Sequence, residues 1–237
     1  MRDQYAGDIS DMLKFAFLRA ITARDMTLGI AWYYSPGYDG RPDGRHVEWK
    51  NEPEWRRLDE ELHASLSTLR ERSIAALEQA AIWPRGTLFH CEPIPSGIGR
   101  RDWGERKRNA LRSANIVFLD PDNGLGETKR HATFSEVQGL RQAGRTIIFI
   151  TFPGRNKRHD VIVRELHERL KAKINATSVI TLRTNVSVPS SPGRYVQRQR
   201  WFTVVDPNAE LIARISTFAR ALTCIPRVTT RLDQSPA

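Results

Sequence analysis

The chain has 237 residues, about one and a half times a typical domain length, so one large domain or one domain with an insertion is expected. Hydrophobic residues make up 40% of the sequence, which excludes a disordered chain. The 37 Lys and Arg residues outnumber the 27 Asp and Glu residues and give a net charge of +10, which favours a polyanionic partner, nucleic acid ahead of an anionic membrane surface.

The first half of the chain predicts several helices and two short strands. Apolar residues at helical spacing, preceded by Asp8 as a capping residue, predict a helix over 9–24. Apolar runs and breaks at Gly and Pro then predict a strand at 28–34, a long loop at 35–45, helices within 55–80 with Ser73 as a second cap, and a strand at 87–91.

The second half alternates strands and helices more regularly. The same signals predict, in order, a loop at 93–99, a helix at 102–112, a strand at 115–119, a helix at 135–143, a strand at 146–152, a helix at 157–173, a strand at 177–182, a loop at 187–194, a strand at 200–205, a helix at 208–222 and a flexible tail from 227 to 237.

This order of elements predicts an α/β fold. Alternation of helices with fully apolar strands is typical of a mostly parallel sheet with helices on both faces. The last two predicted strands are joined by a loop, which indicates antiparallel pairing at one edge. We therefore expect a single domain over 1–226, with a helical insertion at about 35–85.

Cysteine content and hydropathy narrow the class of protein further. The two cysteines, Cys91 and Cys224, exclude a disulfide scaffold and a cysteine-rich zinc site. The longest apolar runs are too short to span a bilayer, and the N-terminal residues lack a signal-peptide hydrophobic segment. A cytoplasmic protein without a membrane partner is expected, and the sequence leaves its oligomeric state open.

The sharpest chemical motif is the stretch DPDNG at 120–124, directly after an apolar strand. In an open α/β sheet, ligands bind outside the carboxyl ends of the strands, where Asp120 is expected to lie. Asp120 and Asp122 are candidates to accept hydrogen bonds from an amine, to bind a metal or to act as a base, with Asn123 beside them. The same residues are also typical of an ordinary turn.

Two further segments are candidates for the same site. Residues 5–14, YAGDISDMLK, combine a helix cap with Asp11 and Lys14 as an i, i+3 pair. The loop SPGYDG at 35–40 follows the first strand, where a glycine-containing loop often approaches a nucleotide-like cofactor. A purely structural role explains each segment as well.

Basic runs near predicted strand ends indicate where nucleic acid is expected to bind. Arg and Lys neutralise phosphates, and neighbouring aromatic residues stack on bases. The candidate contacts from these runs are Arg100, Arg101, Lys107, Arg155, Lys157, Arg158 and Arg198.

Two motifs resemble those of the bacterial large-subunit ribosomal RNA adenine-N6 methyltransferases. Residues 5–14 are similar to their N-terminal signature Ala-Gly-Asn-x-x-Asp-x-Leu-Lys, and Leu119-Asp120-Pro121 is similar to the start of their Asp-Pro-Pro-Tyr motif. The resemblance implies a Rossmann-like, S-adenosylmethionine-dependent methyltransferase fold in which Asp120 accepts a hydrogen bond from the target amine. It implies cofactor contacts at Tyr5, Gly7, Asp8, Asp11, Lys14, Ser35, Gly37 and Gly40.

The chain also departs from this pattern. Asp122 and Asn123 stand where the family has proline and an aromatic residue, and the first-strand loop lacks the family's Gly-x-Gly. Phe134 and Trp103 are candidates for a replacement stacking residue.

Two alternatives to a methyltransferase therefore stay open. One is a nuclease in which Asp8, Asp11, Asp120 and Asp122 bind Mg²⁺. The other is a non-catalytic nucleic-acid-binding protein on a degenerate methyltransferase fold.

Overall fold

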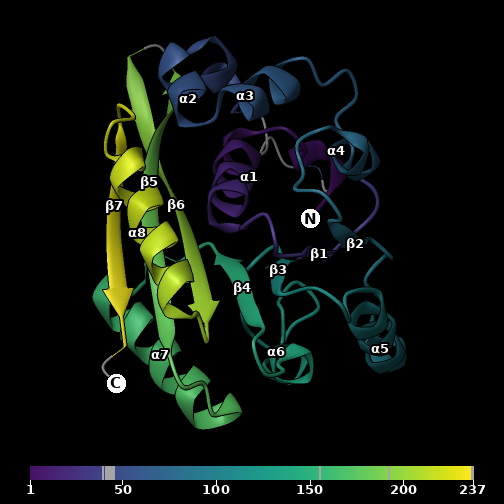
Figure 1. Ribbon diagram of the computed structural model, residues 1–237. Coiled ribbons are helices and arrows are strands. Elements are labelled where there is room, and N and C mark those ends of the chain that lie inside the picture. The colour runs from purple at the N-terminus through teal and green to yellow at the C-terminus, as the bar shows by residue number, and fades with distance from the viewer. Residues whose placement is uncertain (39, 41–45, 155, 192, 236–237) are drawn as a thin grey trace.

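A computed structural model describes residues 1–38, 40, 46–154, 156–191 and 193–235. Within these residues the chain forms one seven-stranded sheet with helices on both faces (Figure 1). The strands are β1 (Leu28–Trp32), β2 (Leu88–His90), β3 (Ile116–Asp120), β4 (Thr146–Thr151), β5 (Val179–Ser191), β6 (Arg194–Val205) and β7 (Val228–Gln234).

The strand order is β2-β1-β3-β4-β6-β5-β7. The first four strands in this order are parallel to one another. β6 runs antiparallel to both of its neighbours, so β5 points the same way as β4, and β7 pairs antiparallel with β5. The sequence-based prediction of a mostly parallel, Rossmann-like α/β sheet with an antiparallel edge strand is confirmed.

The central strands are apolar on both sides because each side faces its own core. All five residues of β3 are buried. Ile116 and Phe118 join one hydrophobic cluster, whereas Val117 and Leu119 join the other. This alternation is the two-residue period of a strand whose two faces are both covered.

The helices divide between these two cores. α1 (Ile9–Ile21) and α8 (Ala209–Leu222) pack on one face, where the Phe17 ring lies 4.5 Å from that of Phe202 and 5.4 Å from that of Phe218. The opposite core is built from α5 (Arg100–Ala110), α6 (Phe134–Leu140) and α7 (His159–Ile174).

The insertion between β1 and β2 is helical, as the sequence predicts. It contains a 3-10 helix (Glu48–Asn51), α2 (Pro53–Leu58), α3 (Glu60–Ser67) and α4 (Ile74–Gln79). Asp59 separates α2 from α3 because its carboxylate caps α3 and also binds Arg19 of α1. Ser73 caps α4, which confirms the predicted second cap.

Two predictions about the C-terminal third are wrong. The 187–194 segment is not a loop over its whole length, because β5 continues to Ser191 and β6 begins at Arg194. The residues after Arg227 are not a flexible tail, because Val228–Gln234 form β7. This strand buries Val228 and covers the edge of β5, and Asp233 binds Arg183 of β5 at 2.6 Å.

The described helices include none that combines the length and the apolar character needed to cross a lipid bilayer.

Candidate functional site

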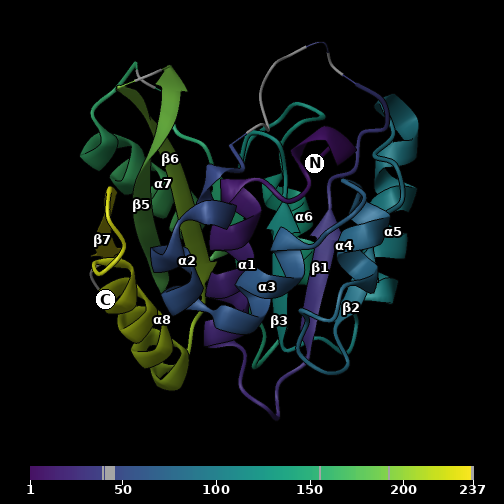
Figure 2. The ribbon, with the colours of Figure 1, turned by 90° about the horizontal axis from the view of Figure 1, so that it is seen from above.

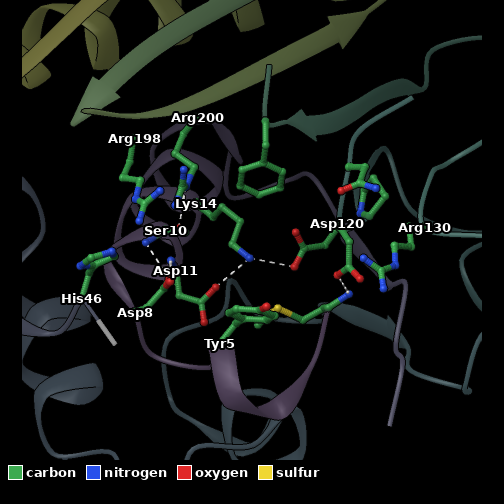
Figure 3. A pocket seen from close by; sticks show the side chains of 15 residues that line it. Tyr5, Asp8, Ser10, Asp11, Lys14, His46, Asp120, Arg130, Arg198 and Arg200 are labelled. Atoms are coloured by element: carbon green, nitrogen blue, oxygen red, sulfur yellow. Dashed lines mark hydrogen bonds and ion pairs between the residues drawn. The ribbon is translucent and has the colours of Figure 1, made fainter. Parts of the chain in front are cut away.

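The candidate site lies where the strand order of the sheet changes direction. β1 pairs with β2 on one side and with β3 on the other, so the chain changes direction across the sheet between these strands. Open α/β sheets bind ligands at the carboxyl ends of the strands flanking such a point. A cavity of about 280 Å³ opens there (Figure 3), lined by Met1, Tyr5, Asp8, Ser10, Asp11, Lys14, His46, Asp120, Pro121, Asp122, Asn123, Arg130, Phe152, Arg198 and Arg200.

A buried ion triad forms the floor of this cavity. The Nζ atom of Lys14, on α1, lies 2.7 Å from Oδ1 of Asp11 and 2.8 Å from Oδ2 of Asp120, at the end of β3 (Figure 3). All three residues are at least 98% buried. One ammonium group thus joins helix α1 to strand β3 and lies between two carboxylates.

The triad changes the protonation chemistry of its members. Burial raises the pKa of Asp11 to about 6, against the attraction of the Lys14 ammonium. Burial lowers the pKa of Lys14, but the two carboxylates outweigh it, so this pKa lies above its ordinary value. Lys14 therefore stays positively charged at neutral pH.

The start of α1 shapes one wall of the cavity. The Asp8 side chain caps the helix by accepting hydrogen bonds from the backbone N–H groups of Ser10 (2.8 Å) and Asp11 (3.3 Å), as the sequence predicts. Gly7 has a φ of +74°, and its N–H donates to Oδ2 of Asp11 at 2.7 Å. The 5–14 motif therefore both begins the helix and orients the Asp11 carboxylate.

The turn after β3 forms the adjacent wall. Asp122 accepts a hydrogen bond from the amino group of Met1 at 2.7 Å, and Asn123 is exposed at the cavity surface. Gly124 has a φ of +86°, and a Cβ atom there would lie 2.7 Å from Oγ1 and 3.1 Å from Cα of Thr151. Glycine at 124 therefore permits the turn to approach β4 closely.

Strands β4 and β6 complete the site from the far side. The Arg200 guanidinium lies 4.8 Å from the centre of the Phe152 ring, and its Nε donates to Oγ of Ser10 at 2.6 Å. Arg198 lies beside His46, whose pKa is lowered by burial and by the charge of Arg198. Arg130 approaches from the opposite side of Asp120 (Figure 3).

The structure gathers many of the predicted site residues in one place. Those that line the cavity are Tyr5, Asp8, Asp11, Lys14, Asp120, Asp122, Asn123 and Arg198. Ser35 instead lines a small neighbouring cavity that it shares with Asp122, and Gly37 accepts a hydrogen bond from Arg2 at 2.9 Å. Ser35, Gly37 and Gly40, the described loop residues that the resemblance implies as cofactor contacts, do not line the main cavity.

Lys107 is buried, whereas the prediction that it contacts nucleic acid requires an exposed side chain. Its side chain is 1% exposed, and its Nζ donates to the Tyr33 hydroxyl at 2.9 Å and lies 3.6 Å from Glu136. Burial lowers its pKa to about 7, against the attraction of Glu136. Arg100 also binds Glu136, at 2.5 Å. Buried between α5 and β1, Lys107 is not positioned to contact a phosphate.

Three of the other basic residues predicted to contact nucleic acid are exposed. Arg101 and Arg158 are exposed, and Lys157 is exposed beside Glu165 at 2.9 Å. Arg155 lies outside the described residues. Phe134 and Trp103, the candidate stacking residues, are both buried in the core opposite α1 and do not line the cavity.

The four aspartates of the alternative metal site have other partners. Lys14 lies between Asp11 and Asp120, Asp8 caps α1, and Asp122 binds the amino group of Met1. In the described part of the chain, no group of three or more His, Cys, Asp or Glu residues is arranged to hold a metal ion.

Five lining residues lie outside the segments and residues that the sequence predicts for the site: Met1, His46, Arg130, Phe152 and Arg200. Phe152 ends the apolar run 146–152, so its position at a parallel strand end is a usable signal. Arg130 and Arg200 reach the cavity only through tertiary packing, and the sequence carries no local signal for either of them.

Comparison with solved structures finds matches at low sequence identity. Protein LPL1258 from Legionella pneumophila str. Philadelphia 1, described with the family label DUF519, is 13% identical, with a TM-score of 0.54 over 97% of this chain and 98% of that chain. An S-adenosylmethionine-dependent methyltransferase from Agrobacterium tumefaciens is 10% identical, with a TM-score of 0.39 over 84% of this chain and 62% of that chain. No protein-family model and no curated protein matches the sequence.

The seven-stranded sheet, with parallel core strands and helices on both faces, defines the chain as a Rossmann-like α/β protein. The likeness to LPL1258 concerns this fold alone, over nearly the whole of both chains.

Proposed function

We propose that this protein is an S-adenosylmethionine-dependent methyltransferase that acts on an amino group of nucleic acid. The observation that carries the proposal is the position of Asp120. It ends β3 at the point where the strand order changes direction, and it lies in the floor of the cavity. A carboxylate at this place resembles the start of the Asp-Pro-Pro-Tyr motif of amine methyltransferases.

The residues of the cavity fit such a cofactor by their chemistry. S-adenosylmethionine combines an amino group, a carboxylate, a positively charged sulfur and a flat ring. The cavity offers the carboxylates of Asp11 and Asp120, the guanidinium groups of Arg130 and Arg198, and the aromatic ring of Tyr5. Its volume of about 280 Å³ is near the lower end of the range for small-molecule sites, ~300–1,000 Å³.

When bound, the cofactor supplies an electrophilic methyl group, and the protein's own residues prepare the amine. Asp120 accepts a hydrogen bond from the amine through Oδ1, because Lys14 binds its Oδ2. This contact orients the nitrogen lone pair toward the methyl group and stabilises the positive charge that develops on nitrogen. Lys14 holds the carboxylate at a fixed position, and the displaced amine proton passes to solvent.

The proposed nucleic-acid target is supported by charge. The chain carries a net charge of +10, and three arginines, Arg130, Arg198 and Arg200, line the cavity. Guanidinium groups at the edge of a site favour phosphate contacts. Phe152, held beside Arg200, replaces in part the aromatic residue that the motif lacks at Asn123.

The nuclease alternative is less favoured by the geometry. In a carboxylate-based metal site, a cation lies between the acidic groups. Here the ammonium group of Lys14 lies between Asp11 and Asp120, within 2.8 Å of each carboxylate. A divalent ion would have to displace a buried lysine with a raised pKa.

Methyl transfer from labelled S-adenosylmethionine to RNA and DNA tests the proposal. The wild-type protein is expected to label one of the two, and Asp120→Asn is expected to lower the rate by about 100-fold or more. Asp25→Asn, an exposed aspartate between α1 and β1, is the matched control and is expected to keep full activity.

Two results would separate the alternatives. Salt-sensitive nucleic-acid binding without any methyl transfer would support a non-catalytic binding protein. Magnesium-dependent cleavage that Asp120→Asn abolishes would support the nuclease.

A further inference from the structure

Three large hydrophobic side chains are strongly exposed among the described residues. They are Tyr38 at 65%, Ile98 at 100% and Tyr195 at 49%. Tyr38 lies in the segment after β1, and Ile98 lies in the segment after β2. Tyr195 lies at the start of β6, next to the turn from β5. Since β1, β2 and β5 all point the same way, the three side chains share the edge of the sheet at which the cavity opens.

Figure 2 shows how this edge is arranged. The β5–β6 hairpin stands on one flank, α5 and the end of β2 stand on the other, and the N-terminal segment lies between them. Met1 and Tyr5 of that segment line the cavity. The exposed apolar side chains therefore come from both flanks of the cavity as well as from the β1 loop.

The segments that carry Ile98 and Tyr195 are held by specific contacts. Ile98 lies in a 3-10 helix (Gly97–Gly99) directly before Arg100, which binds Glu136. The Tyr195 hydroxyl accepts a hydrogen bond from Arg227 at 3.2 Å, and Arg227 also binds Glu52. Exposure on a supported segment indicates a contact surface rather than a frayed end.

Basic side chains accompany the apolar ones along this edge. Arg101 lies in the first turn of α5, Lys129 lies in the turn after β3, Arg158 precedes α7, and Arg194 begins β6; all four are exposed. Exposed carboxylates on these segments, such as Glu127, are fewer. The guanidinium groups of Arg130, Arg198 and Arg200 add positive charge at the cavity itself.

We propose that the carboxyl edge of the sheet is a docking surface for single-stranded nucleic acid. Ile98, Tyr38 and Tyr195 pack against unpaired bases, and the exposed arginines and lysine bind the phosphates. Apolar side chains reach base faces only where the bases are unstacked, so a duplex does not satisfy these contacts. This inference rests on the proposed function, because it names the form of nucleic acid that presents a base to the cavity.

Binding is measured by fluorescence anisotropy with a labelled 20-nucleotide single-stranded RNA and with the same sequence as a duplex. The wild type is expected to prefer the single strand. Ile98→Ser and Tyr195→Ser are each expected to weaken its binding by about tenfold, within the range for loss of one base contact. Arg112→Ser, at an exposed arginine between α5 and β3 on the opposite edge, is the matched control.

Salt dependence separates the two kinds of contact. Arg194→Ser is expected to reduce the slope of log affinity against log salt by about 0.7, the value for one phosphate contact on a single strand, whereas Ile98→Ser leaves the slope unchanged. Thermal unfolding of each variant establishes that the exposed substitutions leave the fold intact.

Several outcomes would overturn the docking surface. Equal binding of single strand and duplex, or full affinity in the Ile98→Ser/Tyr195→Ser variant, would remove this inference and leave the proposed methyl transfer standing. The absence of salt-dependent RNA binding by the wild type would remove the nucleic-acid target as well. Binding to phosphatidylserine vesicles that depends on Ile98, without RNA binding, would assign this edge to a membrane surface instead.

Discussion

Lys14 is the residue on which the charge arrangement of the cavity depends. It is 2% exposed and binds Asp11 and Asp120 within 2.8 Å, so one positive charge offsets two buried negative charges. Removing one partner from such a group leaves uncompensated charge in a medium that solvates it poorly.

The variant Lys14→Met is therefore expected to lower the free energy of unfolding by about 3–5 kcal/mol. Adding Asp11→Asn is expected to restore part of this loss, because one of the two unpaired carboxylates is then neutral. Urea denaturation monitored by circular dichroism measures both variants. Unchanged stability of Lys14→Met would contradict the buried triad.

At the residue scale, the sequence predicts part of the site. The DPDNG turn and the 5–14 segment are found because each is contiguous and follows or begins a regular element. Arg200 reaches the cavity through packing between β6 and α1, which local patterns do not encode. The sequence predicts Lys107 on a basic surface, and this is wrong, because charge in a sequence carries no information about burial.

At the element scale, helix α1 serves both the fold and the site. Its apolar side lies in one core, and its first turn carries Asp8, Ser10, Asp11 and Lys14 into the cavity. Asp8 lines the cavity, and its side chain accepts two backbone hydrogen bonds as a helix cap. A structural role therefore explains this residue without any contact to a ligand.

Two substitutions at Asp8 separate these roles. Asp8→Ala removes the acceptor for two backbone N–H groups and is expected to cost about 1 kcal/mol of stability. Asp8→Ser keeps a capping oxygen and is expected to retain both stability and binding of S-adenosylmethionine. If Asp8→Ser proves as stable as the wild type but loses that binding, Asp8 contacts the ligand directly.

The elements themselves follow closely from local patterns, with instructive exceptions. Apolar runs predict β1, β3 and β4 because both of their faces are buried. β7 was missed because its sequence is polar, and its strand conformation depends on pairing with β5, about fifty residues earlier in the chain. The strands predicted at 177–182 and 200–205 are shorter than β5 and β6, because the Ser, Pro and Gly residues near the turn of this hairpin are typical of loops.

At the scale of the whole molecule, stability is expected to depend on pH through buried histidine. His90, at the end of β2, is 4% exposed, and neither ring nitrogen has a hydrogen-bond partner among the described residues. Its ring lies 5.1 Å from that of Trp103. Burial lowers the pKa of His90 to about 4, from an ordinary value of 6.5.

The sign of the effect follows from linkage. Between pH 6.5 and 4, the unfolded chain protonates this imidazole and the folded chain does not, so stability falls as the pH falls. The variant His90→Leu is expected to reduce this dependence. Part of it remains, because burial also lowers the pKa of His167 to about 4. Denaturation midpoints at pH 4.5 and 6.5 provide the test, and an equal drop in both proteins would contradict it.

Calorimetric titration with S-adenosylmethionine tests whether this proposed cofactor binds in the cavity at the carboxyl ends of β1 and β3. We expect binding of one molecule per chain, weakened by Asp120→Ala, and no stoichiometric Mg²⁺ binding that depends on Asp120 in a parallel titration. No binding of S-adenosylmethionine, together with stoichiometric Mg²⁺ binding lost in Asp120→Ala, would exclude the proposed cofactor and make the aspartates a metal site.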